Sequence, residues 1–320
     1  MTLLPLSSVI GLRFPWVLEN WWRYTVPPLP KELEKLGFAQ PDLAIVDTAL
    51  GAFIPDILAP KVTVYRMTDY NSGFASSTAE LARLERQLAV RADMVAVTAS
   101  ELAERARSLA PAKLVVHIPH GVDFEHFSVP GPAPGDIKAF PAPIAIYVGS
   151  LREWFDSELV SWLAGSLPQI SFVLIGPELA VRGRLAGHPN LHLLGERPYS
   201  LIPYYLQAAQ VGIIPFDRDS YPELVDHANP LKLYEYMAAG LPVVSTDWPV
   251  LRRLASPALL SRSRAEFRDN LLTAIERAGQ LRHAGTEFAR AHSWDASYQA
   301  LRAAVGALTP AAEAPRVSRD

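Results

Sequence analysis

The chain of 320 residues contains no cysteine. This absence excludes disulfide bonds, thiolate metal sites and a cysteine nucleophile, and it fits a reducing compartment. No apolar run of about eighteen residues is free of charge or proline, so the sequence predicts no membrane-spanning helix. The N-terminus also lacks a basic stretch ahead of an apolar one. We therefore expect no secretory signal and a cytoplasmic location.

A surplus of positive charge is missing as well, because 30 Lys and Arg residues face 33 Asp and Glu residues, for a formal net charge of −3. Nucleic acid is therefore a poor candidate partner, since it requires a basic surface. The chain is 49% hydrophobic and 20% charged, which indicates packed cores, and its length is sufficient for two domains.

Short apolar runs rich in β-branched residues alternate with helical patterns along the whole chain. The runs are almost continuously hydrophobic, which is typical of parallel strands covered on both faces. Capping-box spacings at 77–80, 98–101 and 263–266 mark helix starts between them. The sequence therefore predicts an α/β architecture. The predicted strands are residues 43–46, 62–65, 94–97, 114–118, 144–148, 172–175, 191–194, 211–214 and 243–245.

Lysine is scarce in the second half, where Lys232 is the only lysine in residues 139–320. The residues just before it predict a helix start, with Asn229 as the cap and Pro230 at the first helical position. Gly240 predicts the end of that helix, and an apolar strand follows.

In such a helix Lys232 would lie in the first turn, beside backbone N–H groups without helical partners and near the positive end of the helix dipole. That combination is a ready site for phosphate. Glu235 lies three residues further along the same face. The alternative is an ordinary amphipathic helix with one exposed lysine.

Residues 229–244 resemble the donor-site helix of nucleotide-sugar glycosyltransferases with the GT-B fold. Segments 64–69, 120–123 and 147–150 match the same family in the same order, and the resemblance covers roughly residues 40 to 300. It is closest to bacterial exopolysaccharide and cell-envelope transferases of the xanthan glucuronosyltransferase type. The resemblance implies that Lys232 contacts the donor pyrophosphate and that Glu235 contacts ribose or pyrophosphate.

The implied fold is α/β, with two Rossmann-like doubly wound domains and a ligand cleft between them. A Pro- and Gly-rich stretch, 129–135, is the predicted linker. About 40 residues precede the first predicted strand, so the N-terminal domain looks shortened relative to the family. The predicted parts are an acceptor-side domain, a donor domain, a helix crossing back to the first domain, and a tail, at 1–135, 136–292, 293–308 and 309–320.

Asp69 follows the predicted strand at 62–65 and precedes a Gly-bearing loop. A carboxylate at the carboxyl end of a parallel strand could take the proton from an acceptor hydroxyl as that oxygen attacks the anomeric carbon. By resemblance, Asp69 matches the general base of the inverting xanthan-type enzyme. The alternative is that Asp69 caps the next turn.

Further donor-site candidates follow strand ends in the second half. Gly149 and Ser150 place small residues where the backbone must approach a phosphate or base, with Arg152 as a second pyrophosphate ligand. Glu196 matches a donor-side acidic position of the resembling enzymes. An ordinary strand-to-helix turn and a lone exposed glutamate are the alternatives. The predicted donor site comprises Gly149, Ser150, Arg152, Glu196, Asn229, Leu231, Lys232 and Glu235.

Two further comparisons refine the expected chemistry. Retaining members of the fold carry a glutamate eight residues before the position of Glu235, and His227 stands there in this chain, which favours an inverting reaction. The triplet from Asp217 to Asp219 could hold a divalent metal against a diphosphate, as in the other glycosyltransferase fold. Because Lys232 already supplies a cation, we expect no metal and no cofactor.

An aromatic cluster near the N-terminus contains Trp16, Trp21, Trp22 and Arg23. Aromatic rings beside a cation suit a membrane interface, which would bring the chain to a lipid-linked acceptor. The alternative is that these residues pack beneath the first domain.

The sequence thus predicts a metal-independent transferase that moves a sugar from a nucleotide donor to a lipid-linked or cell-envelope glycan at the inner membrane face. The resemblance implies UDP as the nucleotide of the donor, and the sequence alone does not distinguish a UDP-sugar from a GDP-sugar. Two other interpretations stay open: an inactive or incomplete paralogue that binds a nucleotide sugar or a protein, and a nucleotide-sugar epimerase.

Overall fold

The computed structural model describes residues 7–8, 20–74, 77–177, 183, 185 and 187–308. Trp16 and the predicted tail at 309–320 lie outside these residues. Backbone contacts divide the chain into two units. The first comprises Met1–Pro119 together with Gln299–Asp320, and the second is His120–Tyr298.

The first unit contains a parallel four-stranded sheet whose strands follow chain order, β3-β4-β5-β6. A two-stranded antiparallel pair, β1-β2, precedes it. The strands are β1 (Ser7–Ser8), β2 (Thr25–Val26), β3 (Leu43–Val46), β4 (Val62–Met67), β5 (Met94–Val97) and β6 (Leu114–His117). The helices are α2 (Leu29–Lys35), α3 (Ile54–Leu58), α4 (Ala79–Arg91), α5 (Leu102–Leu109) and the end of α14 (Trp294–Leu308).

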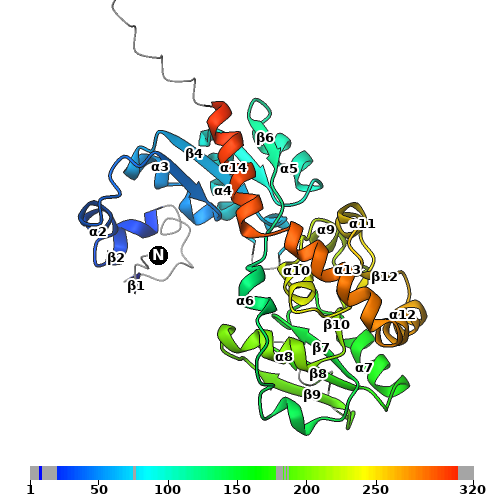
Figure 1. The fold of residues 1–320 in the computed structure, drawn as a ribbon. Coiled ribbons are helices and arrows are strands. Elements are labelled where there is room, and N and C mark those ends of the chain that lie inside the picture. Colours follow the sequence, from blue (N-terminus) through cyan, green and yellow to red (C-terminus); the bar gives the residue numbers. More distant parts are fainter. Residues whose placement is uncertain are drawn as a thin grey trace, which may run out of the picture. The chain divides into compact units, whose positions relative to one another are not determined.

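Both faces of this sheet are covered, as its unbroken apolar strands require. Val64 of β4 packs into a core that includes Leu301 of α14, which lies over the sheet (Figure 1). The next residue, Tyr65, points to the other face, where its hydroxyl donates to Glu85 of α4 at 2.9 Å. The alternation of side chains along a strand therefore sends neighbouring residues into two separate layers.

The second unit contains a parallel six-stranded sheet in the order β12-β11-β10-β7-β8-β9. Its strand order reverses between β7 and β10, and the open end of a parallel sheet at such a point is a usual ligand site. The strands are β7 (Ile144–Val148), β8 (Ser171–Ile175), β9 (Leu191–Gly195), β10 (Val211–Ile214), β11 (Val243–Thr246) and β12 (Leu259–Ser261).

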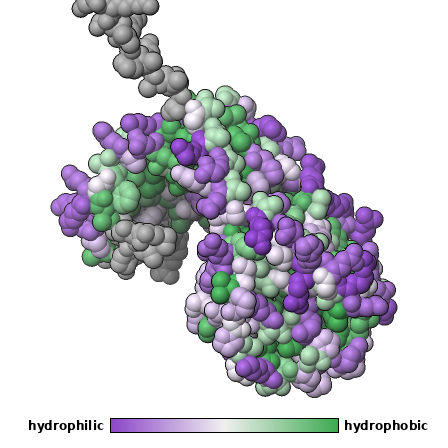
Figure 2. All heavy atoms as spheres, viewed as in Figure 1, coloured by the Kyte–Doolittle hydropathy of each residue, from purple (hydrophilic) through white to green (hydrophobic). Residues whose placement is uncertain are grey.

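The helices of the second unit lie along this sheet and its edges (Figure 1). They are α6 (Phe124–Ser128), α7 (Ser157–Ser166), α8 (Ile202–Ala208), α9 (Pro222–Asp226), α10 (Leu231–Ala238), α11 (Pro249–Leu254), α12 (Arg264–Glu276), α13 (Ala278–Ala291) and the start of α14. Figure 2 shows hydrophilic and hydrophobic residues interspersed over the visible face of each unit. Within the described ranges, every helix is too short or too polar to cross a bilayer.

The α/β prediction is confirmed, and every predicted strand is present, with ends that shift by a residue or two. Only one predicted capping box starts its helix as expected: Ser263 accepts from the backbone of Glu266 at 3.1 Å. At α4 the cap is Thr78, one residue later than predicted. The prediction at 98–101 is wrong, because α5 starts at Leu102 without a side-chain cap and the Thr98 hydroxyl donates to a carbonyl.

The boundary between the units falls at Pro119/His120, ahead of the predicted 135/136 boundary. The reason is α6, which packs against α8 and α10 of the second unit. The Pro- and Gly-rich stretch therefore lies within the second unit. At the other end, α14 begins in the second unit and ends in the first, where Leu301 and Leu308 join the core.

Candidate functional site

The ammonium group of Lys232 lies at the point where the strand order of the second sheet reverses. Its Nζ is 5.2 Å from the ring centroid of Tyr147, at the end of β7, and 5.0 Å from that of Phe216, just after β10. Both rings present a face to the cation, an arrangement that stabilises it electrostatically. A backbone bridge between Phe155 and Phe216 ties the two loops together beneath the lysine.

The end of β7 is built so that the lysine can approach it. A Cβ atom on Gly149 would lie 3.1 Å from Lys232 Cε and 3.2 Å from Nζ, and Gly149 has a φ of +147°. Gly176, at the end of β8, has a φ of +144°, and a Cβ there would meet the Gly149 carbonyl oxygen at 2.0 Å. A side chain at position 149 would close the space beside the ammonium group, and one at position 176 would collide with the backbone of Gly149.

Helix α10, which carries Lys232, is fastened to β7 by a buried tyrosine. The Tyr236 hydroxyl accepts from the Val148 N–H at 2.6 Å and donates to the Val148 carbonyl at 3.3 Å. Nearby, the Tyr147 hydroxyl donates to the Ser150 carbonyl at 2.9 Å, which holds the loop after β7. Lys232 is thus placed by polar contacts to the backbone as well as by packing.

The predicted role of Asn229 as a helix cap is wrong. The cap residue is Pro230, without a side-chain hydrogen bond, and α10 begins at Leu231. Asn229 is buried, and its amide oxygen accepts from the Tyr234 hydroxyl at 2.9 Å. The predicted end is confirmed: Gly240 has a φ of +74°, and its N–H donates to the Met237 carbonyl at 3.0 Å.

Glu235 lies one turn after Lys232 and is half-buried. Burial raises the pKa of this carboxyl above its ordinary value, against the opposing attraction of Lys232 and His126. Two side chains from different helices, Lys232 of α10 and His126 of α6, therefore attract this carboxylate. A ligand hydroxyl donating to it would replace part of the lost hydration.

The remaining predicted donor residues lie along the same open edge of the sheet. Ser150 is half-buried, whereas Arg152, Glu196 and Leu231 are exposed. Glu196 directly follows Gly195, whose carbonyl accepts from the Gly176 N–H at 3.0 Å, so the ends of β8 and β9 are joined. Arg152 and Glu196 are available to a ligand at this edge, while Ser150 offers its backbone.

Asp69 belongs to the first unit and is exposed, two residues after the end of β4. The 3-10 turn that follows comprises Asn71–Gly73, and its cap position is Tyr70. The general-base and turn-capping interpretations of Asp69 both stay predictions. Asn71 donates to the buried Glu85 at 3.0 Å, and Arg105 pairs with the same carboxylate at 2.9 Å. These contacts hold the loop that begins at Asp69.

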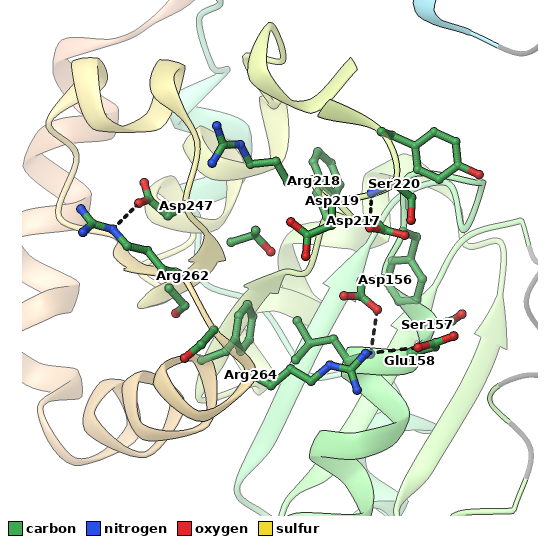
Figure 3. Close-up of a pocket in the computed structure, with 18 of the residues that line it drawn as sticks. Asp156, Ser157, Glu158, Asp217, Arg218, Asp219, Ser220, Asp247, Arg262 and Arg264 are labelled. Carbon is green, nitrogen blue, oxygen red and sulfur yellow. Dashed lines mark hydrogen bonds and ion pairs between the residues drawn. The ribbon is translucent and has the colours of Figure 1, made fainter. Parts of the chain in front are cut away.

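A cavity of about 540 Å³ opens at the ends of β10, β11 and β12 (Figure 3). Asp217 and Asp219 line it, but the Asp217 carboxylate accepts from the Ser220 N–H at 2.9 Å, and Arg218 between them pairs with Asp226. Within the part of the chain that the structure describes, no three His, Asp or Glu side chains are grouped to hold a metal.

The same cavity contains a buried carboxylate, Asp247, with two exposed arginine partners. Asp247 accepts from Arg252 at 2.6 Å. It also accepts from Arg262 at 2.8 Å (Figure 3). Burial alone would raise the pKa of Asp247, but the two arginines outweigh it and lower the pKa. Because the carboxylate and the two guanidinium groups form ion pairs with one another, we interpret them as a structural contact that stabilises the loops after β11 and β12.

Two of the tryptophans proposed for a membrane interface, Trp21 and Trp22, pack on the first unit. The Trp21 indole N–H donates to the Leu50 carbonyl at 2.9 Å, and the Trp22 ring stacks on Phe53 with centroids 5.5 Å apart. Both are half-buried, while Arg23 is exposed, with its guanidinium 4.9 Å from the Trp22 ring centroid. Much of the surface of Trp21 and Trp22 is therefore covered by contacts within the first unit, as the alternative interpretation of packing beneath this domain predicts.

Two Rossmann-like units with this topology define the GT-B fold, and solved structures agree. Sucrose-phosphate synthase from Thermosynechococcus elongatus is 19% identical to this chain, with a TM-score of 0.69. The match covers 90% of this chain and 79% of the synthase chain. Anabaena HepE in complex with UDP-glucose is 18% identical to this chain, with a TM-score of 0.67. That match covers 88% of this chain and 82% of the HepE chain. The GT-B prediction is confirmed.

Residues 142–277, which lie within the second unit, match the family "Glycosyl transferases group 1". A curated relative, "Putative teichuronic acid biosynthesis glycosyltransferase TuaH" of Bacillus subtilis (strain 168), is 25% identical over 60% of this chain. The chain matches about half of that relative's length, 50%. The predicted relationship to bacterial GT-B glycosyltransferases is thus confirmed, and the xanthan-type specificity stays a prediction.

Three residues near Lys232 and Glu235 are not among those predicted from the sequence: Tyr236, His126 and Tyr199. The sequence pattern indicates Tyr236 only as part of a helix, although its hydroxyl fastens α10 to the sheet. His126 and Tyr199 stack on each other and lie near Glu235. No local pattern marks them, because each acts across a large sequence separation.

Proposed function

We propose that this chain is a glycosyltransferase that moves a sugar from a UDP-sugar to a lipid-linked or cell-envelope glycan. The observation that carries the proposal is the position of Lys232, held against Gly149 at the strand-order reversal of the second sheet. The match to the glycosyltransferase family and the UDP-glucose complex of a structural neighbour support the choice of donor.

Lys232 and the start of α10 are suited to the leaving group of such a reaction. As the bond between the anomeric carbon and the donor phosphate oxygen breaks, negative charge develops on the diphosphate. The ammonium group and the first N–H groups of the helix neutralise that charge. Arg152, exposed on the loop after β7, is the proposed second cation.

Asp69 is the proposed general base of an inverting displacement. Its carboxylate would accept the proton of the acceptor hydroxyl while that oxygen forms the new bond to the anomeric carbon. Its exposed position at the carboxyl end of β4 supports this role. We propose that the reaction needs no metal, since Lys232 supplies positive charge and Asp217 is already engaged by the backbone of Ser220.

The proposed acceptor is a lipid-linked or envelope glycan, in keeping with the teichuronic acid biosynthesis named for the curated relative. The exposed Arg23 beside Trp22 is the proposed contact with anionic membrane lipid. Co-sedimentation with anionic liposomes tests this contact. Arg23→Glu should reduce binding, and binding equal to wild type would contradict it.

Transfer from radiolabelled UDP-sugars to a bacterial membrane extract, with and without EDTA, tests the function as a whole. The proposal expects a labelled, lipid-extractable product and the same rate in EDTA. UDP-sugar binding without transfer would instead favour a binding paralogue. A new nucleotide sugar formed in the absence of extract would favour an epimerase.

A further inference from the structure

A second group of side chains lies near Glu235. His126 of α6 and Tyr199, at the start of the 3-10 turn Tyr199–Leu201, stack with ring centroids 4.9 Å apart and an interplanar angle of 14°. Phe127, which is fully buried, packs edge-on against both rings. The imidazole is therefore held in a fixed plane by two aromatic neighbours.

One nitrogen of this imidazole has unused hydrogen-bonding capacity. His126 Nε2 is buried, and it pairs with no other group in the part of the chain that the structure describes. The backbone N–H of His126 donates to Asp123 at 3.0 Å, so Asp123 is engaged as the cap of α6. Buried polar atoms normally have a partner, and one left without is a candidate ligand contact.

The surroundings of His126 identify the kind of ligand. Helix α6 packs on α10, and His126 attracts the Glu235 carboxylate, which Lys232 also attracts. Tyr199 is 60% exposed, so the stacked pair borders solvent. Along α10 a cation is thus followed, one turn later, by a carboxylate acceptor beside an imidazole.

A nucleoside diphosphate presents groups in the same succession, with a diphosphate followed by a ribose that carries two neighbouring hydroxyls. Each hydroxyl both donates and accepts a hydrogen bond, so a carboxylate alone satisfies only half of its capacity. A carboxylate paired with an imidazole offers both an acceptor and a donor.

We propose that His126 is a nucleoside-recognition residue, which hydrogen-bonds a ribose hydroxyl of the donor together with Glu235, while Tyr199 positions its ring. This inference rests on the proposed function. It assigns ribose recognition to α6, a segment that follows directly on the boundary between the units.

Calorimetric titration of the full chain with UDP, 2′-deoxyUDP, 3′-deoxyUDP and inorganic pyrophosphate tests the inference. His126→Phe keeps a ring to stack on Tyr199 and removes both nitrogens. His192→Phe is the matched control, because His192 also stacks on an aromatic ring, Phe140, at 3.9 Å in the same unit. Melting curves establish that both variants fold.

His126→Phe should weaken UDP binding about tenfold, roughly the effect of one hydrogen bond, and leave pyrophosphate binding unchanged. The loss should disappear with one of the deoxy analogues, and His192→Phe should bind UDP like wild type. Equal losses for UDP and pyrophosphate, or unchanged UDP affinity, would overturn the inference.

Wild-type protein alone supplies a second measurement that does not depend on folding of the variant. It should bind one deoxy analogue about tenfold more weakly than UDP; equal affinities for all three nucleotides would overturn ribose recognition. Absence of any UDP binding by wild type would overturn the proposed function itself, a result distinct from UDP binding that His126→Phe leaves unchanged.

Discussion

At the scale of single residues, the chemistry of the site depends on charges whose surroundings are fixed by neighbours. Lys232 lies beside two aromatic rings and a glycine, and both Lys232 and His126 attract the Glu235 carboxylate. Asp69 is an exposed carboxylate just after the end of β4. Substituting each group should therefore have a different consequence for binding, turnover or stability.

Asp69→Asn should lower the rate of sugar transfer about 10² to 10⁴-fold, because an amide cannot accept the acceptor proton. UDP affinity should stay at the wild-type value. Initial rates and UDP titration check the two quantities. Asp47→Asn, an exposed carboxylate just after β3, is the control and should transfer normally. Wild-type rates in Asp69→Asn would remove this residue from the mechanism.

Glu235→Gln should raise the melting temperature at neutral pH. Burial raises the pKa of Glu235 above its ordinary value of 4.5, so the folded state binds this proton more tightly than the unfolded state. Ionisation at higher pH therefore costs stability, and the glutamine avoids that cost. The advantage should vanish below the ordinary carboxyl pKa.

Melting curves at neutral and acidic pH measure this difference for ligand-free protein. Glu276→Gln, an exposed glutamate at the end of α12, should show no such pH-dependent gain. A Glu235→Gln protein that is less stable than wild type at neutral pH would mean that attraction to Lys232 and His126 outweighs burial.

At the scale of elements, the site depends on the docking of α10 against β7. Tyr236→Phe should lower the free energy of unfolding of the second unit by about 1–3 kcal/mol, because it leaves the Val148 N–H without its partner. Urea unfolding measures the change. Tyr221→Phe, a half-buried tyrosine outside this helix, should change stability little. Equal stability of Tyr236→Phe and wild type would show that packing alone docks the helix.

Much of this element-scale picture could be predicted from local sequence. Unbroken apolar runs located the strands, and Gly240 marked the end of α10. The start of α10 was misplaced because Asn229 fits a cap as a residue type but is drawn inward by Tyr234. β12, with only Leu259–Ser261, is too short to stand out as a strand.

Interactions between residues that are far apart in the sequence could not be predicted from it. Tyr236 meets Val148, 88 positions away, and His126 meets Tyr199 only because α6 packs against α8 and α10. Neither pair leaves a periodic signal. The lysine itself was recognisable from its isolation in an arginine-rich half, whereas the aromatic rings around it were not.

At the scale of the whole molecule, the two units have separate cores although the chain passes between them twice. Residues from Gln299 onward complete the first unit, with Leu301 in contact with its sheet core. The predicted boundary missed this arrangement because a Pro- and Gly-rich stretch is a linker signal that also occurs in loops within a domain.

Leu301→Asp should destabilise the first unit by about 3 kcal/mol or more, since it buries an unpaired charge in an apolar core. UDP binding by the second unit should persist. Limited proteolysis followed by mass spectrometry locates the loosened unit. Ala303→Asp puts the same charge on an exposed face of α14 and should be neutral. Cleavage confined to the second unit would contradict this division.

Calorimetric titration of UDP into wild type and Lys232→Ala tests the central claim most directly, with Lys138→Ala as a control for loss of an exposed lysine in the same unit. One charge-assisted contact of about 1.5–3 kcal/mol should weaken UDP binding by roughly 10- to 150-fold in Lys232→Ala, while Lys138→Ala binds like wild type. Equal UDP affinity in Lys232→Ala and wild type would contradict a diphosphate site at the start of α10.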